Sequence, residues 1–97
     1  MSSRYPVSKA IGRKITYYRK MKGISLDELA TIIGVSQQQQ SRYERGVNRI
    51  NLDRLDQYAQ IFGIHIKDFF ILDEKDNFEI KNILLIRSGI KNEKYNN

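Results

Sequence analysis

The sequence has no cysteine, so the chain can form neither a disulfide framework nor a thiolate metal site, and it suits a reducing compartment. It also has no apolar run long enough to span a bilayer. Its first six residues, MSSRYP, lack the apolar core of a signal peptide. These absences lead us to expect a soluble, cytoplasmic protein without a membrane partner.

Residues that would indicate an enzyme are scarce. The only histidine, His65, has no carboxylate pair and no second ligand at metal-binding spacing. The sequence also has no glycine-rich phosphate loop and no nucleophile motif. We therefore expect a binding protein with no catalytic residue, no metal and no cofactor, in which His65 is a capping or surface imidazole.

Negative charge is scarce relative to positive charge. The 97 residues suit one domain with one modest core, and their 17 lysines and arginines against 11 acids give a net charge of +6. Residues 1–22 contain no acid but seven cations: Arg4, Lys9, Arg13, Lys14, Arg19, Lys20 and Lys22. This balance suits a polyanionic partner, although each single cation also suits a solvated surface.

Only one proline and six glycines interrupt the chain, and the apolar residues between them recur at helical steps. An all-α domain is therefore predicted. We expect a first helix that is capped by Ser8 and ends at Gly23. The inner face of this helix carries Ile11, Ile15 and Tyr18.

The next two helices are predicted to cross steeply. Residues 25–28 have the S-x-x-E form of a capping box, which opens a second helix that Gly34 ends. Three residues, Gly34, Val35 and Ser36, separate Ile33 from a run of four glutamines, so the third helix begins at once with Ser36 as N-cap. Two helices joined in this way have the geometry of a helix-turn-helix, with Val35 buried in the corner.

A fourth helix is predicted from the N-cap Asn51 to Gly63, and residues 66–70 give a short fifth. The five helices form one domain over residues 8–71, after an amino-terminal arm at residues 1–7. The inner face of the fourth helix is expected to carry five apolar residues: Leu52, Leu55, Tyr58, Ala59 and Phe62.

Beyond this domain the chain stays too apolar for a free tail. Asp76 or Asn77 can cap a sixth helix, although the isoleucine spacing also tolerates a strand. Because the domain already has a core, the extra apolar face either covers that core or meets a second subunit, and we favour the subunit. Dimerisation is expected through residues 72–90, with residues 91–97 disordered. Its apolar contacts are Phe78, Ile80, Ile83 and Leu84.

Residues 11–70 resemble the helix-turn-helix family of the phage repressors and Cro proteins, often called Xre-like. The resemblance rests on apolar residues around a small residue and a glycine, followed by the ending YERG: Leu29, Ala30, Ile33, Gly34, Val35 and residues 43–46. The run SQQQ followed by SRYERG is most similar to small regulators encoded beside bacterial fimbrial operons. The resemblance implies a dimeric, sequence-specific DNA-binding transcription regulator whose motif, residues 26–45, places the third helix in the major groove.

Helical geometry divides the four glutamines. Successive residues turn by about 100°, so Gln40 shares a face with Tyr43 and Glu44, while Gln38 and Arg42 share the opposite face. If the Tyr43 face packs inward, Gln38 and Arg42 project outward. Base contacts are then expected from Gln37, Gln38 and Arg42. Gln39 lies on the flank of the helix, and the resemblance places five further residues near the phosphates of the DNA backbone: Ser36, Ser41, Arg45, Asn48 and Arg49.

The chain departs from the family pattern at two positions. The family commonly opens its second helix with a phosphate-binding glutamine where this chain has Leu26, so the resemblance does not extend to that contact. The family also has an apolar residue where this chain has Gln40, and we expect Gln40→Leu to stabilise by up to about 1–2 kcal/mol. The resemblance further implies a structural ion pair between Arg19 and Glu44.

Two other functions suit the same fold. One is the DNA-binding antitoxin of a toxin pair, in which the surplus apolar carboxyl-terminal segment would bind a toxin rather than a second copy. The chain also suits a protein-interaction adapter that has lost its DNA contact, because the glutamine of the second helix is missing. The sequence leaves both alternatives open.

Overall fold

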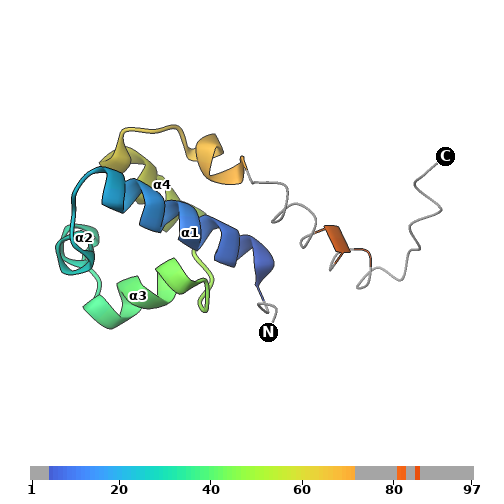
Figure 1. Ribbon diagram of the computed structural model, residues 1–97, viewed down its shortest axis with the longest axis horizontal. Helices are drawn as coiled ribbons and strands as arrows, with labels where there is room; N and C mark the ends of the chain where they lie inside the picture. The colour runs from blue at the N-terminus through green and yellow to red at the C-terminus, as the bar shows by residue number, and fades with distance from the viewer. Residues whose placement is uncertain (1–4, 72–80, 83–84, 86–97) are drawn as a thin grey trace.

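The computed structural model describes residues 5–71, 81–82 and 85, and residues 5–71 form a bundle of helices (Figure 1). The elements are α1 (Pro6–Met21), α2 (Leu26–Ile33), α3 (Gln37–Arg45), α4 (Leu52–Phe62) and the 3₁₀ turn η1 (Ile66–Phe70). No strand occurs in residues 5–71, which confirms the prediction of an all-α domain.

The predicted count of five α-helices is wrong, because residues 66–70 form a 3₁₀ turn. His65 and Asp68 cap this turn reciprocally: His65 Nδ1 accepts from the backbone N–H of Lys67, and Asp68 Oδ2 accepts from that of His65. The backbone bonds from Asp68 to His65 and from Ile71 to Asp68 also span three residues. A segment of only five residues suits the tighter i→i+3 pattern, which proteins use in short pieces.

The carboxyl-terminal predictions fall mostly outside the described residues. Within the segment at residues 72–90, the structure describes residues 81–82 and 85, which are helical. The tail at residues 91–97 lies outside the described residues. So do the four residues expected at the dimer contact: Phe78, Ile80, Ile83 and Leu84.

Helix α1 begins three residues earlier than the sequence pattern predicts. Tyr5 is its N-cap and Pro6 its first residue, so Ser8 caps nothing and Pro6 and Val7 belong to the helix. Proline suits this position, because its fixed φ matches the helix and its missing N–H has no partner within the first turn. The other predicted N-caps are present: Ser25, Ser36 and Asn51 each accept a hydrogen bond from the backbone N–H three residues on.

The corner between α2 and α3 has the expected geometry. Ser25 and Glu28 form a reciprocal capping box, and the hydrogen bonds from the Ser25 backbone and side chain lower the pKa of Glu28. Gly34 ends α2 with a φ of 88°, in the left-handed region that glycine favours. Val35 is half-buried between the two helices and packs against the core.

The core lies between α1, α2, α4 and η1. Its buried cluster consists of Ile11, Ile15, Leu29, Ile33, Leu55, Tyr58, Ala59, Phe62 and Phe69. Tyr58 stacks on Phe62, with ring centroids 6.1 Å apart, and Tyr18 meets Phe69 edge to face. Leu52, which the helical pattern places inward, is 68% exposed at the first position of α4, where the helix has only begun to turn toward the core.

The backbones of α1 and α3 come into direct contact at two glycines. A Cβ added to Gly12 would lie 2.5 Å from the carbonyl oxygen of Tyr43 and 2.6 Å from that of Glu44. At the end of α3, Gly46 has a φ of 70°, and a Cβ there would lie 2.3 Å from Cα of Lys9. Glycine at both positions is what allows α3 to lie directly against α1.

Glu44 fixes this contact electrostatically. Its side chain is almost fully buried, and Arg19 of α1 donates to both carboxylate oxygens, Nε to Oε2 at 2.8 Å and Nη2 to Oε1 at 3.1 Å. Thr16 Oγ1 lies 2.9 Å from Oε1, and Arg19 Nη1 donates to the carbonyl of Ile24 at 3.0 Å. The structure thus joins the two residues for which the family resemblance implies an ion pair.

Gln40 extends the same network into the core. Its side chain is 0% exposed, and Nε2 donates to Glu44 Oε2 at 2.8 Å. Its Oε1 accepts a hydrogen bond from the hydroxyl of Tyr58 in α4. Burial raises the pKa of the Tyr58 hydroxyl, so this group stays protonated and donates at neutral pH. The glutamine that stands in an apolar position of the family is therefore paired at both ends of its amide.

We predict that Glu44→Ala destabilises the fold by about 3–5 kcal/mol, because Arg19 would be left as an uncompensated, largely buried charge. Urea denaturation of Glu44→Ala, Arg19→Ala and the double variant measures this loss and the coupling between the two residues. The exposed Asp56→Ala serves as the control and should change stability by less than about 0.5 kcal/mol. Purely additive effects of the two substitutions would contradict the pair.

The network reverses the sequence-based expectation for Gln40. Gln40→Leu leaves the Tyr58 hydroxyl without its acceptor in the core, so we predict a destabilisation of about 1–3 kcal/mol rather than a gain. Combining it with Tyr58→Phe removes both polar partners and should restore much of that loss. Thermal melts of the two single variants and the double variant measure this. A Gln40→Leu variant that melts above the parent would show that the network adds nothing.

Candidate nucleic-acid interface

The outer face of α3 carries amides and cations. Four of its polar side chains are exposed: Gln37, Gln38, Arg42 and Arg45. Glu44 is the one acid of α3 and is buried on the opposite face, so the outer face carries no negative side chain. A cationic face with amide donors and acceptors has the chemistry that suits DNA.

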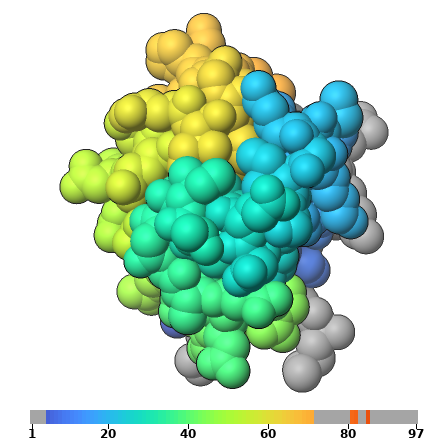
Figure 2. Space-filling model, turned by 90° about the vertical axis from the view of Figure 1, so that its left-hand side faces the viewer, coloured from blue at the N-terminus to red at the C-terminus, as the bar shows by residue number. Residues whose placement is uncertain are grey.

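Helix α3 lies at the edge of the domain. In Figure 1 it runs along the lower side, with α1 above it and α2 at its amino-terminal end. Figure 2 looks at the side where α2 and α3 meet, and there α3 forms the lower end of the visible face. The exposed side of the helix is therefore free to enter a groove of a duplex.

Gln37 and Gln38 occupy the first turn of this helix, directly after the N-cap Ser36. Arg42 lies one turn further on the same side as Gln38, and its Nη2 donates to Asn48 Oδ1 at 3.1 Å. Asn48 belongs to the loop after α3, so this loop holds the guanidinium of Arg42 in place. The sequence-based prediction gave Asn48 a contact to the DNA backbone and missed this bond.

The expected flanking residues lie around α3 and its following loop. Ser36 is exposed, and its side-chain oxygen accepts from the backbone N–H of Gln39 at 3.0 Å. Ser41 is half-buried. Leu26, where the family has a phosphate-binding glutamine, is the first residue of α2, half-buried, and has no polar group to offer.

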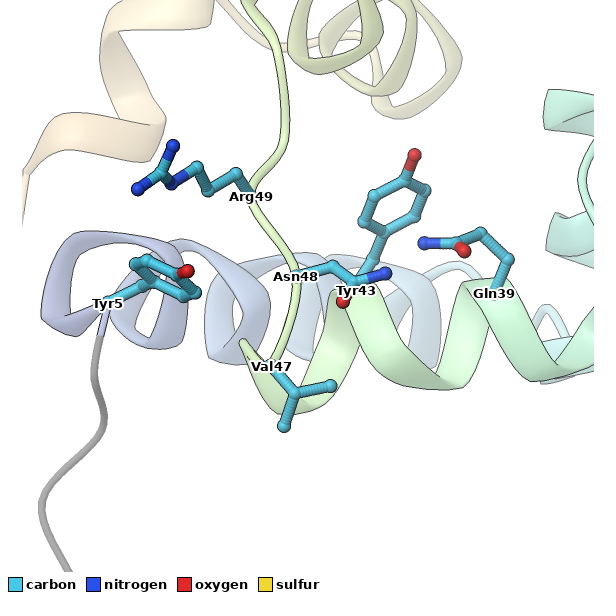
Figure 3. Close-up of a pocket in the computed structure, with 6 residues that line it drawn as sticks. All are labelled: Tyr5, Gln39, Tyr43, Val47, Asn48 and Arg49. Carbon is cyan, nitrogen blue, oxygen red and sulfur yellow. The ribbon is translucent and has the colours of Figure 1, made fainter.

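Gln39, Asn48 and Arg49 line one shallow hollow beside α3 (Figure 3). Tyr5, Tyr43 and Val47 complete its lining. Figure 3 shows Gln39 and Tyr43 projecting to the same side of α3, with the loop that carries Asn48 and Arg49 running past them. The structure therefore gathers three of the predicted flanking residues, while Arg45 lies on the exposed side of α3.

Tyr5 is a partner that the sequence did not reveal. The guanidinium carbon of Arg49 lies 4.7 Å above the centroid of its ring, within the range of a cation–π contact. Figure 3 shows Arg49 extended from the loop toward the start of α1, where Tyr5 lies. No local pattern joins residues so far apart in the chain, so this contact required the tertiary structure.

Other kinds of site find no support in the part of the chain that the structure describes. Within it, no group of three or more histidines, cysteines, aspartates and glutamates could hold a metal ion. None of the helices described here is long and apolar enough to cross a membrane. His65 has a structural role as the cap of η1.

A protein-family model described as HTH_3, helix-turn-helix, matches residues 15–69, which is more than half of the chain. The chain belongs to this family. The match includes α2 and α3, the two helices that the sequence resemblance assigns to the helix-turn-helix motif. The family assignment confirms the helix-turn-helix resemblance found in the sequence. The narrower likeness to fimbrial regulators stays a prediction.

Curated relatives of this helix-turn-helix protein are described as HTH-type transcriptional regulators. An uncharacterized HTH-type transcriptional regulator of Sinorhizobium medicae is 34% identical over 65 residues, which cover 67% of this chain and 47% of the relative. One of Rickettsia conorii is 39% identical over 64 residues, covering 66% of this chain and 51% of the relative. The chain thus spans about half the length of the curated relatives that it matches.

Solved structures support the fold of this helix-turn-helix protein. The clp gene regulator ClgR from Corynebacterium glutamicum superposes with a TM-score of 0.68 at 25% identity, covering 84% of this chain and 88% of that one. The SinR protein/SinI protein complex matches with a TM-score of 0.58 at 25% identity, covering 88% of this chain and 86% of that one.

Proposed function

We propose that this helix-turn-helix protein is a cytoplasmic, sequence-specific DNA-binding transcription regulator that places α3 in the major groove. One observation carries the proposal: the two faces of α3 are sharply divided. Gln40 and Glu44 are buried in a polar network on the inner face, while Gln38 and Arg42 are exposed on the outer face. The inner face holds the helix, and the outer face is left for recognition.

The outer face has the chemistry of base readout. A glutamine amide both donates to and accepts from adenine, and an arginine donates two hydrogen bonds to guanine, each worth about 1–3 kcal/mol of discrimination. We assign these roles to Gln37, Gln38 and Arg42. Gln37 and Gln38 suit this role further because recognition helices contact base edges through their amino-terminal residues.

The flanking residues supply contacts to the DNA backbone, which position the protein without reading sequence. Arg45 and Arg49 are exposed cations on either side of Asn48. Ser36, Gln39 and Ser41 lie along or before α3 and can donate hydrogen bonds to phosphate oxygens. Because this binding displaces counterions, affinity for any duplex should fall steeply as the salt concentration rises.

A selection from a pool of duplexes with a randomised centre tests the proposal directly. The parent protein should enrich one sequence, and footprinting of the DNA upstream of its own gene should protect a matching site. Binding that shows neither enrichment nor salt dependence would exclude a DNA-binding regulator and favour the adapter.

We predict that Gln38→Ala weakens binding to the selected duplex by about 1–3 kcal/mol while leaving thermal stability and affinity for unrelated duplexes nearly unchanged. Gln60→Ala is the matched control, because it removes an exposed glutamine of α4, where its amide bonds only locally to Asp56. Fluorescence anisotropy with both duplexes measures the affinities. Equal losses in the two variants would refute the assignment of Gln38 to the groove.

We further propose that the protein acts as a homodimer through residues 72–90, a segment in which the sequence pattern favours a sixth helix after Asp76 or Asn77. The support is sequence-based: an apolar segment with Phe78, Ile80, Ile83 and Leu84 follows a domain whose core is already complete. Two copies would then read half-sites centred about 10 base pairs, or a multiple of one helical turn, apart.

Truncation before Asn77 should leave a folded monomer with weakened affinity for the selected duplex, because the dimer contact is removed and the core of residues 5–71 is kept. Sedimentation equilibrium and circular dichroism measure the mass and the helical content. The full-length chain is the control. A truncated chain that still sediments as a dimer would place the interface within the described domain.

A protein partner is the second candidate for the carboxyl-terminal segment. One of the solved structures that resemble this chain is a complex of two proteins, SinR and SinI. A complex of that kind would also agree with the antitoxin alternative. If the protein encoded by the neighbouring gene co-purifies with this chain and the chain does not self-associate, the carboxyl-terminal segment binds a protein partner.

A further inference from the structure

Gln40 differs from the other glutamines of α3 in joining three helices. Its Oε1 accepts from the Tyr58 hydroxyl of α4, and its Nε2 donates to Glu44, which Arg19 of α1 holds. A continuous chain of hydrogen bonds therefore runs from α4 through α3 to α1. We call its first step, between Gln40 and the Tyr58 hydroxyl, the Gln40–Tyr58 link.

The link connects two helices whose backbones are not closely packed. Helix α3 packs mainly on α1 and α2. Its connection to α4 runs through long side chains, with Tyr58 bonded to Gln40 and meeting the Tyr43 ring edge to face at a centroid distance of 6.3 Å. Tyr58 itself is 0% exposed and stacks on Phe62, so its hydroxyl is held at a fixed point.

The link acts on the face of α3 opposite to Gln38 and Arg42. A rotation of α3 by about 10° would move a side-chain tip 5–6 Å from the helix axis by about 1 Å. A shift of that size is enough to spoil paired hydrogen bonds to a base, which depend on distance and angle. Apolar side chains would fill the space between α3 and α4, but they would not fix the rotation of α3, because the hydrophobic effect has no preferred direction.

We infer that Gln40 and Tyr58 are positioning residues for sequence recognition, which set the rotation of α3 and so the aim of Gln38 and Arg42. The inference rests on the proposed function. It adds to it a dependence of base preference on two buried residues that lie too deep to contact DNA. On the inner face of α3, Glu44 ties the helix to α1 and Gln40 ties it to α4.

The test compares Tyr58→Phe, which removes one hydroxyl, with the parent. The probes are the duplex selected by the parent and a scrambled duplex of equal length. Tyr58→Phe should lower the ratio of the two affinities by about tenfold, at a temperature where the variant is fully folded, while affinity for the scrambled duplex is kept. Gln40→Leu should have a similar effect, and the two effects should not add, because either substitution removes the same hydrogen bond.

Phe69→Leu is the matched control for lost stability. Phe69 is 0% exposed in the core, where its ring meets Tyr18 and Phe62, so its truncation destabilises while Gln40 and the Tyr58 hydroxyl, the two partners of the link, are both kept. Its affinity ratio should stay that of the parent. An unchanged ratio in Tyr58→Phe, or an equal fall in Phe69→Leu, would overturn the inference and leave the link a structural bond only.

A second readout needs no DNA. In the free protein, Tyr58→Phe should shift the backbone amide resonances of Gln37, Gln38 and Arg42, and Phe69→Leu should not. Unmoved resonances in Tyr58→Phe would overturn the positioning role. If the parent selects no sequence, the proposed function fails, and the resonances alone still decide whether the link sets the rotation of α3.

Discussion

The buried carboxylate of Glu44 is the interaction on which the arrangement of α3 depends. A carboxylate so deep in a small domain costs free energy unless its oxygens are paired, and here Arg19, Thr16 and Gln40 all contact them. Removing water from the site strengthens each of these bonds, because the local dielectric is low. Helix α3 is therefore held by charge and by directional hydrogen bonds as well as by apolar packing.

This arrangement separates two tasks along a helix of nine residues. The inner face specifies where α3 lies, and the outer face is free to carry whichever side chains a DNA sequence requires. Asn48, in the loop after α3, accepts a hydrogen bond from Arg42 and lines the hollow beside α3. The loop therefore also helps to position the outer face of the helix. An arginine held by a neighbour loses less side-chain entropy on binding than a free one.

Much of the fold could be predicted from the sequence because its signals are local. The caps Ser25, Ser36 and Asn51 act within three residues, and the helical register of α3 alone separates Gln38 from Gln40. The start of α1 was missed because two local signals competed there: Pro6 at the first helical position outranks Ser8 as a cap.

The remainder could not be predicted because it depends on residues far apart in the chain. Nothing local pairs Gln40 with Tyr58, which lies 18 positions away, or Arg49 with Tyr5. A glutamine in an apolar position was nevertheless a signal: a buried amide requires partners, and a tyrosine on the inner face of another helix can supply one. The exposed face of α3 could be predicted from helical periodicity, whereas the contacts between residues far apart in the chain could not.

The contact at Gly12 has a consequence for redesign. Because no side chain separates α1 from α3 there, the spacing of the two helices is set by the meeting of their backbones and does not change with side-chain volume. Residues on the far side of α3 can then be randomised without moving the helix along or away from α1. If the proposed function holds, a combinatorial library at Gln37, Gln38 and Arg42 would vary the exposed residues of α3 while its distance from α1 stays fixed.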